Sequence, residues 1–401
     1  MTNDETRRFI AEHDGEDIRQ LALHAGNFAN KNINIPFALN QIAGRKTAAT
    51  KAPSLLQYTE LIYPSRLAVE QCSSETTAQY KASLLSGKTF ADLTGGFGID
   101  FIFISQKFRH ATYVEQQKEL CRIVSHNFKI IGLGNIHIEN TDSLTYLKSL
   151  IQPLDAIFID PARRTTSGRR TSTISESEPN LIEIQKILLE KAPVVLVKLS
   201  PMLDIHQTLK DINHVAEIHI TGAESECKEL LLLLKQGFTG EPVIYPVITD
   251  TMPLPCKHAF TRSSEKNLSI NHTSTLLKYL YEPHAVFLKA GCYKSIAQWF
   301  DIQKIHPDSH LYTSDRLVEN FPGRTFAIED TSSWNKKELK AFLRNISRAN
   351  LTVRNFPDTT DNILKRLKIR QGGNTNIFAT TLADGKHVLL KVREAEKQVG
   401  G

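Results

Sequence analysis

Between Lys88 and Lys235 the sequence alternates short apolar runs with longer amphipathic stretches. The runs that read as β-strands are TFADL, ATYVE, IHIEN, LDAIFID, PVVLVKL, VAEIHI and ELLLLLK. Helical spacing follows between them, as at 99–108, 116–131 and 181–190. Such alternation predicts an α/β domain with a parallel, doubly wound sheet. The short connection before the last run indicates that this run is antiparallel.

The chain of 401 residues is too long for one ordinary core, so several domains are expected. Residues 1–87 read as helical, with helices expected at 16–28 and 54–63 and a capped helix after Ser73-Ser74-Glu75. Proline-rich residues 241–253 indicate a boundary, and Tyr281-Glu282-Pro283 is expected to be a turn. We therefore expect four parts: a helical region at 1–87, the doubly wound domain at 88–240, and α+β domains at 241–325 and 326–401.

Composition excludes several classes of protein. Hydrophobic residues at 41% and charged residues at 23% are globular values. The polar start and the absence of long apolar stretches indicate a soluble, cytoplasmic protein with no membrane partner. Five scattered cysteines and the histidine spacing show no disulfide framework and no metal site, so no metal is expected.

Positive charge gathers near the C-terminus. The net charge of the whole chain is +6, yet residues 335–394 contain 13 Lys and Arg against five acids. A basic module of this kind suits a polyanion such as RNA, because each contact between a cation and a phosphate also releases counterions. A solvated helix face explains the same charges equally well.

A glycine loop joins the first strand to the first helix of the alternating region: Asp92-Leu93-Thr94-Gly95-Gly96-Phe97-Gly98-Ile99-Asp100. Glycines at this place let the backbone approach a ligand without a Cβ in the way, and either a dinucleotide or S-adenosylmethionine fits. A dinucleotide fingerprint needs a small residue where Phe101 stands, which favours S-adenosylmethionine. The residues expected to contact this cofactor are Asp92, Thr94, Gly95, Gly96, Gly98 and Asp100.

Three acids follow three successive strands. Asp92 ends the first strand, where its carboxylate suits the amino-acid part of the cofactor. Glu115 ends the second strand, where an acid can accept bonds from both ribose hydroxyls. Asp142 follows the third strand and is expected to meet the adenine amino group. An ordered set of acids around a glycine loop favours a cofactor site over a purely structural role.

Asp160 and Pro161 follow the fourth strand and are the expected reaction site, with Asp160 also near the cofactor. In amino-group methyltransferases of nucleic acids the corresponding motif continues with a second proline and an aromatic residue. Here Ala162 and Arg163 stand instead, so the motif does not specify the acceptor atom. Lys198, at the end of the fifth strand, is expected to lie near substrate, although pairing with the carboxylate of Asp160 is the preferred role.

Arginines crowd the loop after Pro161: Arg163, Arg164, Arg169 and Arg170. Guanidinium groups offer a planar fork of donors, so this loop is expected to bind substrate phosphates. Pairing with Glu176, Glu178 or backbone carbonyls is the alternative. No cysteine lies near this loop, so a covalent cysteine nucleophile is not expected.

These motifs together resemble class I S-adenosylmethionine-dependent methyltransferases, and in particular a bacterial group with a C-terminal THUMP-like domain. The resemblance rests on Ser73-Ser74-Glu75, the glycine loop, Asp160-Pro161-Ala162-Arg163-Arg164 with Gly168-Arg169-Arg170, Lys198-Leu199-Ser200-Pro201-Met202-Leu203-Asp204, Arg354-Asn355-Phe356 and Gly372-Gly373. It implies a Rossmann-like catalytic domain, a ferredoxin-like domain at 241–325, a basic THUMP-like domain at 326–401, and RNA as substrate class.

The leading hypothesis is therefore a methyltransferase that uses S-adenosylmethionine and acts on structured RNA, either rRNA or tRNA. A methyltransferase of proteins or small molecules and a non-catalytic RNA-binding protein are the alternatives. The motifs specify neither the target nucleotide nor the oligomeric state.

Overall fold

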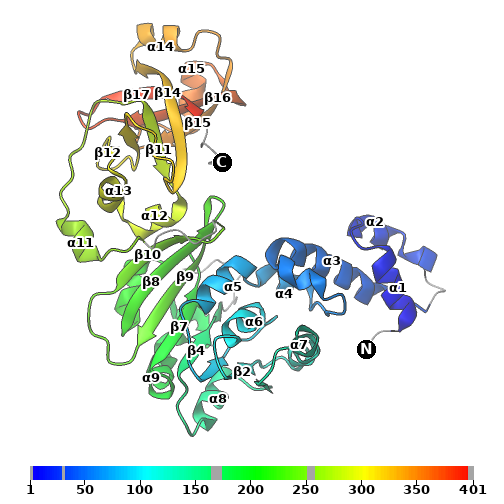
Figure 1. The fold of residues 1–401 in the computed structure, drawn as a ribbon. Helices are drawn as coiled ribbons and strands as arrows, with labels where there is room; N and C mark the ends of the chain where they lie inside the picture. Colours follow the sequence, from blue (N-terminus) through cyan, green and yellow to red (C-terminus); the bar gives the residue numbers. More distant parts are fainter. Residues whose placement is uncertain (1–2, 29–31, 164–173, 251–257, 396–401) are drawn as a thin grey trace. The chain divides into compact units, whose positions relative to one another are not determined.

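The computed structural model describes residues 3–28, 32–163, 174–250 and 258–395, and the chain divides into two compact units (Figure 1). The first unit comprises Met1–Ile218 and Glu229–Pro242, and the second comprises His219–Lys228 and Val243–Gly401. Strands β8 (Val215–Ala223) and β9 (Glu226–Lys235) each run through both units. The base of this hairpin belongs to the first unit, and its tip belongs to the second.

The first unit begins with helices. They are α1 (Asp4–Glu12), α2 (Ile18–Leu23), α3 (Ile35–Lys51), α4 (Arg66–Gln71) and α5 (Glu75–Ala82), with 3-10 turns at Ala25–Phe28 and Pro53–Gln57. The first three helices share a small core of Phe9, Leu21, Ala38 and Ile42. Ser74 caps α5 as expected, because its hydroxyl accepts a hydrogen bond from Thr77 N.

The helix expected over residues 54–63 is wrong. Only the turn Pro53–Gln57 is helical, and the chain that follows is not helical. The Asn127 side chain bonds to both the N–H and the carbonyl of Ile62, at 2.9 and 2.8 Å. This tertiary contact holds the backbone where a helix would use its own hydrogen bonds. The expected helix at 16–28 is reduced to α2 and the following 3-10 turn.

The larger sheet has eight strands, in the order β10-β8-β9-β7-β4-β1-β2-β3; β7, β4, β1, β2 and β3 lie wholly in the first unit, whereas β10 belongs to the second. The strands besides the hairpin are β1 (Thr89–Asp92), β2 (His110–Val114), β3 (Ile136–Glu139), β4 (Ala156–Ile159), β7 (Val194–Leu199) and β10 (Val243–Ile248). Strands β3, β2, β1, β4 and β7 are parallel, and β9 is antiparallel to β7. The expected antiparallel last run is thus confirmed.

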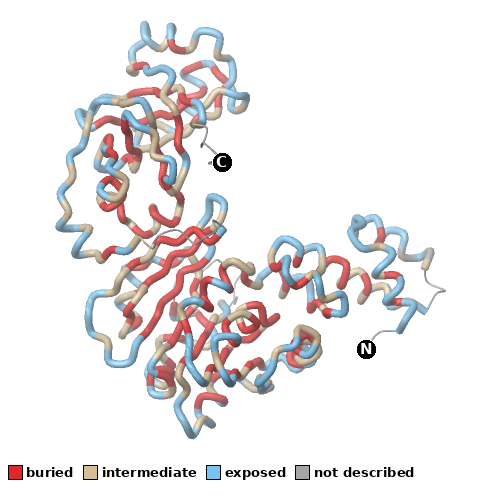
Figure 2. Tube along the Cα trace, viewed as in Figure 1, coloured by how far each residue is buried: buried red, intermediate tan, exposed pale blue. Residues whose placement is uncertain are grey.

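Helices connect the parallel strands. They are α6 (Ile99–Ser105), α7 (Lys118–Ile131), α8 (Ser143–Ser149), α9 (Leu181–Lys191) and α10 (Ile205–Asp211), with a short antiparallel pair of β5 (Ala162–Arg163) and β6 (Ser177–Glu178). Figure 2 shows buried residues along the central strands, and every residue of β4 is buried. Continuous burial is typical of parallel strands covered on both faces. The predicted α/β doubly wound fold is confirmed.

The second unit is built on a seven-stranded sheet, in the order β12-β13-β11-β14-β17-β16-β15. Its strands are β11 (Tyr279–Pro283), β12 (Gln303–Lys304), β13 (Tyr312–Ser314), β14 (Gly323–Ser333), β15 (Arg348–Arg354), β16 (Arg370–Thr381) and β17 (His387–Glu394). Its helices are α11 (Arg262–Asn267), α12 (Ala285–Ala290), α13 (Tyr293–Phe300), α14 (Lys336–Phe342) and α15 (Thr360–Leu367).

One expectation about the second half of the chain needs correction. The expected turn at residues 281–283 is part of β11, which pairs with β13 and β14; its proline stands at the end of the strand, where a missing N–H is tolerated. The two compact units divide between Pro242 and Val243, inside the proline-rich residues 241–253 expected to be a boundary, and β10 at the edge of the eight-stranded sheet lies in the same range. The four-part division of the chain stays a prediction, and its limit at residue 325 falls within β14. No helix in the described ranges is long and apolar enough to cross a bilayer.

Candidate active site at the carboxyl ends of the strands

The glycine loop turns tightly against β2. A Cβ on Gly95 would lie 2.0 Å from Cε2 of Tyr113, so no other residue fits here without movement. Gly96 and Gly98 have φ of +54° and +85°, which L side chains rarely adopt. The loop closes with a hydrogen bond of 2.8 Å from Gly98 N to the carbonyl of Gly95. The backbone is therefore bare where the sequence predicts contact with a cofactor.

Phe101 explains the packing behind the loop. Its ring has no exposed surface and lies 5.2 Å from the ring of Phe128 and 5.6 Å from that of Tyr113, between centroids. A small residue at this position would let α6 approach the sheet closely, as dinucleotide-binding domains require. The large ring fills that space instead.

Glu115 ties the loop to the end of β2. One carboxylate oxygen accepts a hydrogen bond of 3.1 Å from Gly96 N, and the other accepts one of 2.8 Å from Gln117 N. The side chain is 8% exposed and faces the cavity described below. Its predicted contact with a ribose stays a prediction.

Asp92 ends β1 with only 1% of its surface exposed. Its Oδ1 accepts a hydrogen bond of 3.0 Å from Thr94 N. Burial raises the pKa of Asp92 well above its ordinary value, and the nearby carboxylates of Asp100, Asp160 and Glu115 raise it further. A positively charged ligand beside Asp92 would stabilise the ionised form of its carboxyl group.

Asp142 is the N-cap of α8. Its Oδ1 accepts hydrogen bonds from Leu144 N and Thr145 N, at 3.0 and 2.9 Å. Hydrogen bonds from the side chain and backbone of Thr145 lower the pKa of Asp142. The residue is exposed and faces the same cavity, so a contact with adenine stays a prediction with the helix cap as an added role.

These residues surround one cavity of about 610 Å³ at the carboxyl ends of the parallel strands. Apart from the glycine loop, Asp100, Glu115, Asp142, Asp160 and Lys198, its walls include Ala68, Gln71, Cys72 and Ser73 from the helical region, and Glu178, Pro179, Asn180 and Glu183 from the segment before and within α9. A cavity of this size suits a nucleoside-sized ligand. The N-terminal helical region thus supplies part of the wall.

Asp160 lies where β4 ends, and two contacts hold it. Its backbone N–H donates a hydrogen bond of 2.7 Å to Oγ1 of Thr94 in the glycine loop. Its Oδ2 lies 2.5 Å from Nζ of Lys198, so the preferred pairing of these two side chains is present. Burial raises the pKa of Asp160, whereas the charge of Lys198 opposes the rise. Pro161 follows, and Ala162 faces the cavity.

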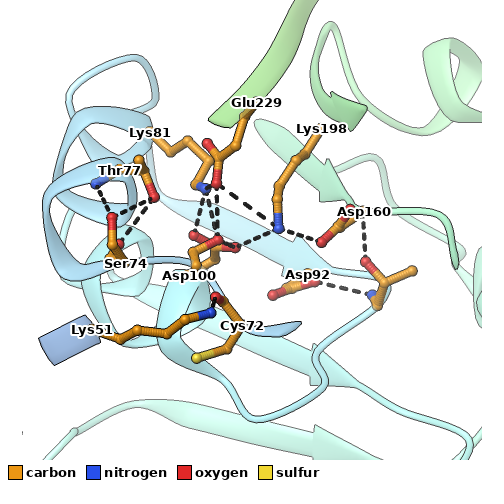
Figure 3. A network of polar contacts seen from close by, with 12 residues as sticks. Lys51, Cys72, Ser74, Thr77, Lys81, Asp92, Asp100, Asp160, Lys198 and Glu229 are labelled. Atoms are coloured by element: carbon orange, nitrogen blue, oxygen red, sulfur yellow. Dashed lines mark hydrogen bonds and ion pairs between the residues drawn. The ribbon is translucent and has the colours of Figure 1, made fainter. Parts of the chain in front are cut away.

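A buried network of charges extends from this pair (Figure 3). Asp100, in the first turn of α6, pairs with Lys81 of α5 at 2.9 Å, and Glu229 of β9 pairs with the same lysine at 2.7 Å. Burial alone would raise the pKa of Asp100, but Lys81 and Lys198 lower it below its ordinary value. The network therefore keeps the Asp100 carboxylate ionised.

The sequence did not single out Lys81. A signal for Lys81 exists in the burial pattern of its helix. Thr77, Ala78, Lys81 and Ala82 share the buried face of α5, and a lysine on such a face needs buried acceptors. The identity of these acceptors depends on which helix and strand meet α5, here α6 and β9, and one sequence does not reveal that.

The predicted arginine loop is only partly described. The backbone of Arg163 belongs to β5, but its side chain and all of Arg164, Arg169 and Arg170 lie outside the described residues. Their binding of phosphate stays a prediction. Within the described ranges, no group of three or more His, Cys, Asp or Glu could hold a metal ion.

Exposed cations gather on the helices and strand ends of the second unit. Those with no ion pair to another described residue are Lys336, Lys337, Lys340, Arg344, Arg348, Lys365, Arg366, Lys368 and Arg370. Arg348 and Arg370 are register partners on β15 and β16. By contrast, Arg354 is paired with the buried carboxylate of Glu282 at 2.6 Å. The charges of the nine exposed residues, which we call the basic face, are therefore available to a partner.

Comparisons with known proteins identify similar chains and domains. Residues 279–322 match a ferredoxin-like domain, and residues 323–394 match a THUMP domain-like family. A candidate methyltransferase from Porphyromonas gingivalis W83, known from a crystal structure, is 33% identical over 99% of this chain and 100% of its own, with a TM-score of 0.83. Ribosomal RNA small subunit methyltransferase D of Buchnera aphidicola is 25% identical over 154 residues, which are 38% of this chain and 75% of that protein.

Proposed function

The chain belongs to the family of class I methyltransferases that carry ferredoxin-like and THUMP-like domains at the C-terminus, and we propose that it transfers a methyl group from S-adenosylmethionine to RNA. The observation that carries the proposal is the 610 Å³ cavity in which the bare glycine loop faces Asp92, Glu115 and Asp160.

The residues of the cavity fit S-adenosylmethionine. A Cβ on Gly95 would push into the ring of Tyr113, so the loop keeps a cradle of bare backbone. Asp92 is a buried carboxyl beside this cradle, and burial raises its pKa, so a cationic ligand would favour its ionised form. We assign Asp92, Thr94, Gly95, Gly96, Gly98, Asp100, Glu115, Asp142 and Asp160 to this site. The chemistry that this cofactor supplies is a methyl group activated on a sulfonium.

In the proposed reaction this chain positions the acceptor and excludes water. Asp160 lies at the cavity with its carboxylate held by Lys198 and its backbone held by Thr94. In that position its free oxygen accepts a hydrogen bond from the N–H or O–H group to be methylated. In-line alignment of the two reacting groups lowers the barrier without a catalytic triad. Pro161 fixes the backbone after Asp160, and the charge of Lys198 favours the ionised form of the carboxylate.

RNA is the acceptor class that the second unit favours. The similar Buchnera protein is named for methylation of small-subunit ribosomal RNA, and residues 323–394 match a THUMP domain-like family. The exposed cations of α14, α15 and the ends of β15 and β16 offer phosphate contacts. Arg163, Arg164, Arg169 and Arg170 would add contacts near the methyl donor.

Titration calorimetry tests the cofactor part of the proposal. The purified chain is expected to bind S-adenosylmethionine and S-adenosylhomocysteine with one site each, and Glu115→Ala is expected to weaken both. A flat titration with both ligands would remove the proposal. Binding without methyl transfer to any RNA would instead favour a protein or small-molecule acceptor, or a non-catalytic RNA-binding protein.

A further inference from the structure

Lys81 is a buried lysine on α5 that does not itself line the cavity. Its Nζ lies 2.9 Å from Oδ1 of Asp100, 2.7 Å from Oε1 of Glu229 and 2.9 Å from Oγ of Ser73 (Figure 3). Ser73 Oγ and Glu229 Oε1 accept hydrogen bonds from the ammonium, and the carboxylate of Asp100 forms an ion pair with it. Burying a charge costs free energy unless it is paired, and the charge of Lys81 is paired with two carboxylates.

Lys198 faces the same two acids from the other side. Its Nζ lies 3.8 Å from Oδ2 of Asp100 and 4.0 Å from Oε1 of Glu229, but 2.5 Å from Oδ2 of Asp160. The ammonium of Lys198 therefore has three carboxylates within reach and sits on the one that belongs to the reaction site. For Lys198 to stay on Asp160, another group must weaken its attraction to Asp100 and Glu229.

We propose that Lys81 is a positioning residue for methyl transfer: by neutralising Asp100 and Glu229 it leaves Lys198 on Asp160. Ser73 supports this arrangement, because its hydroxyl also lies 2.7 Å from Oδ2 of Asp100 and 3.2 Å from Oε1 of Glu229. The helix before β1 thus contributes a charge that acts on the reaction site through Asp100 and Lys198, without touching substrate or cofactor.

The charges around Asp160 give the sign of the effect. The charged groups that face it are Asp92 on β1, Asp100 on α6, Lys81 on α5, Lys198 on β7 and Glu229 on β9, with Glu115, Glu178 and Glu183 on the same cavity. Loss of Lys81 adds one uncompensated negative charge to this set and draws Lys198 toward Asp100 and Glu229. Both changes favour the protonated form of Asp160.

Lys81→Met tests the inference, since methionine keeps the length of the side chain and removes the charge. Lys235→Met is the matched control. Lys235 is the last residue of β9, but it pairs with Glu217 at 2.8 Å and its side chain is 46% exposed. The first measurement is a crystal structure of each variant near neutral pH. We expect Lys198 of the Lys81→Met variant to lie within hydrogen-bond distance of Asp100 or Glu229 and to leave Asp160, and we expect no change in the control.

The second measurement is the pH profile of methyl transfer at saturating S-adenosylmethionine, with RNA from a strain that lacks the gene as acceptor. The acid limb of kcat is expected to move up by about one pH unit in Lys81→Met, which is roughly a tenfold loss of kcat below that limb. The affinity for S-adenosylhomocysteine is expected to change less than about threefold, because Lys81 does not line the cavity. A purely structural role would lower the melting temperature and leave the pH profile in place.

Glu229→Gln keeps the inference testable if Lys81→Met does not fold. The double variant Lys81→Met/Glu229→Gln has the same net charge as the wild type and is compared with Glu229→Gln alone. In Glu229→Gln, Lys81 still neutralises Asp100, whereas in the double variant Lys198 is shared between the carboxylates of Asp100 and Asp160. The acid limb of kcat should therefore lie at higher pH in the double variant. Equal profiles, or a Lys198–Asp160 contact that survives in every variant, would overturn the inference.

The inference rests on the proposed function for its kinetic readout alone. If the wild-type chain transfers no methyl group to any RNA, the proposed function fails, and the crystal structures still decide whether Lys81 controls the partner of Lys198. If the wild type transfers methyl groups and Lys81→Met is unchanged in structure and pH profile, only the inference fails.

Discussion

The backbone N–H of Asp160 donates a hydrogen bond of 2.7 Å to Oγ1 of Thr94. This contact joins the loop that follows β1 to the end of β4, and so it links the part of the cavity assigned to the methyl donor with the part assigned to the acceptor. Methyl transfer depends on the distance and alignment between these two parts. The hydroxyl group of Thr94 thus helps to fix the position of both parts of the cavity.

Thr94→Val keeps the shape of the side chain and removes that hydroxyl. We expect a loss of about 1 kcal/mol in the free energy of unfolding, because the N–H of Asp160 loses its acceptor. We also expect kcat to fall while the affinity for S-adenosylhomocysteine stays within about threefold. Thr94→Ser retains the oxygen and serves as the control. Urea unfolding and steady-state rates check both, and equal behaviour of the two variants would contradict the assigned role.

The two glycines of the loop should respond differently to the same methyl group. At Gly95 a Cβ would lie 2.0 Å from Tyr113, whereas at Gly96 the nearest atom is 3.8 Å away and only the positive φ opposes alanine. We expect Gly96→Ala to cost about 1 kcal/mol of unfolding free energy and Gly95→Ala about 2 kcal/mol or more. Chemical denaturation measures both costs. A Gly95→Ala variant as stable as Gly96→Ala would show that the loop moves freely.

Asp92→Asn should stabilise the free protein at neutral pH. Burial raises the pKa of the folded-state carboxyl, so its contribution to stability is full below the unfolded pKa and is lost as pH rises through the folded value. Asparagine keeps the acceptor for Thr94 N and cannot ionise. We expect the stability advantage of the variant over the wild type to grow as the pH rises from the unfolded-state pKa toward the folded-state pKa of Asp92, and we expect the variant to bind S-adenosylmethionine more weakly. The measurement is the free energy of unfolding of both proteins as a function of pH. A difference between variant and wild type that does not change with pH would disprove the assignment.

The fold could be predicted from sequence wherever local pattern and tertiary environment agree. All seven apolar runs between Lys88 and Lys235 are strands, because continuous apolar runs suit a sheet covered on both faces. The pattern misled where a distant partner decides the conformation. Asn127 bonds to the backbone of Ile62 and replaces an expected helix. At Tyr281, β13 and β14 extend an expected turn into a strand.

The candidate site divides in the same way. Asp92, Glu115 and Asp160 could be placed because the carboxyl ends of parallel strands meet at one edge of a sheet. Lys81 could not, because its acids come from α6 and β9, which are 19 and 148 positions further along the chain. A side chain that acts through other side chains leaves little trace in the spacing of one sequence.

The basic face of the second unit can be tested through the salt dependence of RNA binding. Arg348→Gln/Arg370→Gln removes two adjacent cations that have no ion pair with another described residue. We expect the slope of log affinity against log salt concentration to fall by about two, and the affinity for RNA to fall roughly tenfold at moderate salt. Lys386→Gln is the control, since Lys386 pairs with Asp384 at 2.8 Å. An equal loss in the control would show that charge alone, and not this face, binds RNA.

The central claim is that this chain moves a methyl group from S-adenosylmethionine to RNA. The most direct measurement incubates the purified chain with S-adenosylmethionine carrying a deuterated methyl group and with rRNA and tRNA from a strain that lacks the gene, followed by mass spectrometry of the nucleosides. We predict one labelled methylated nucleoside, and about a hundredfold less label with Asp160→Asn. The absence of label from every RNA nucleoside, under conditions where S-adenosylhomocysteine binds, would contradict the claim.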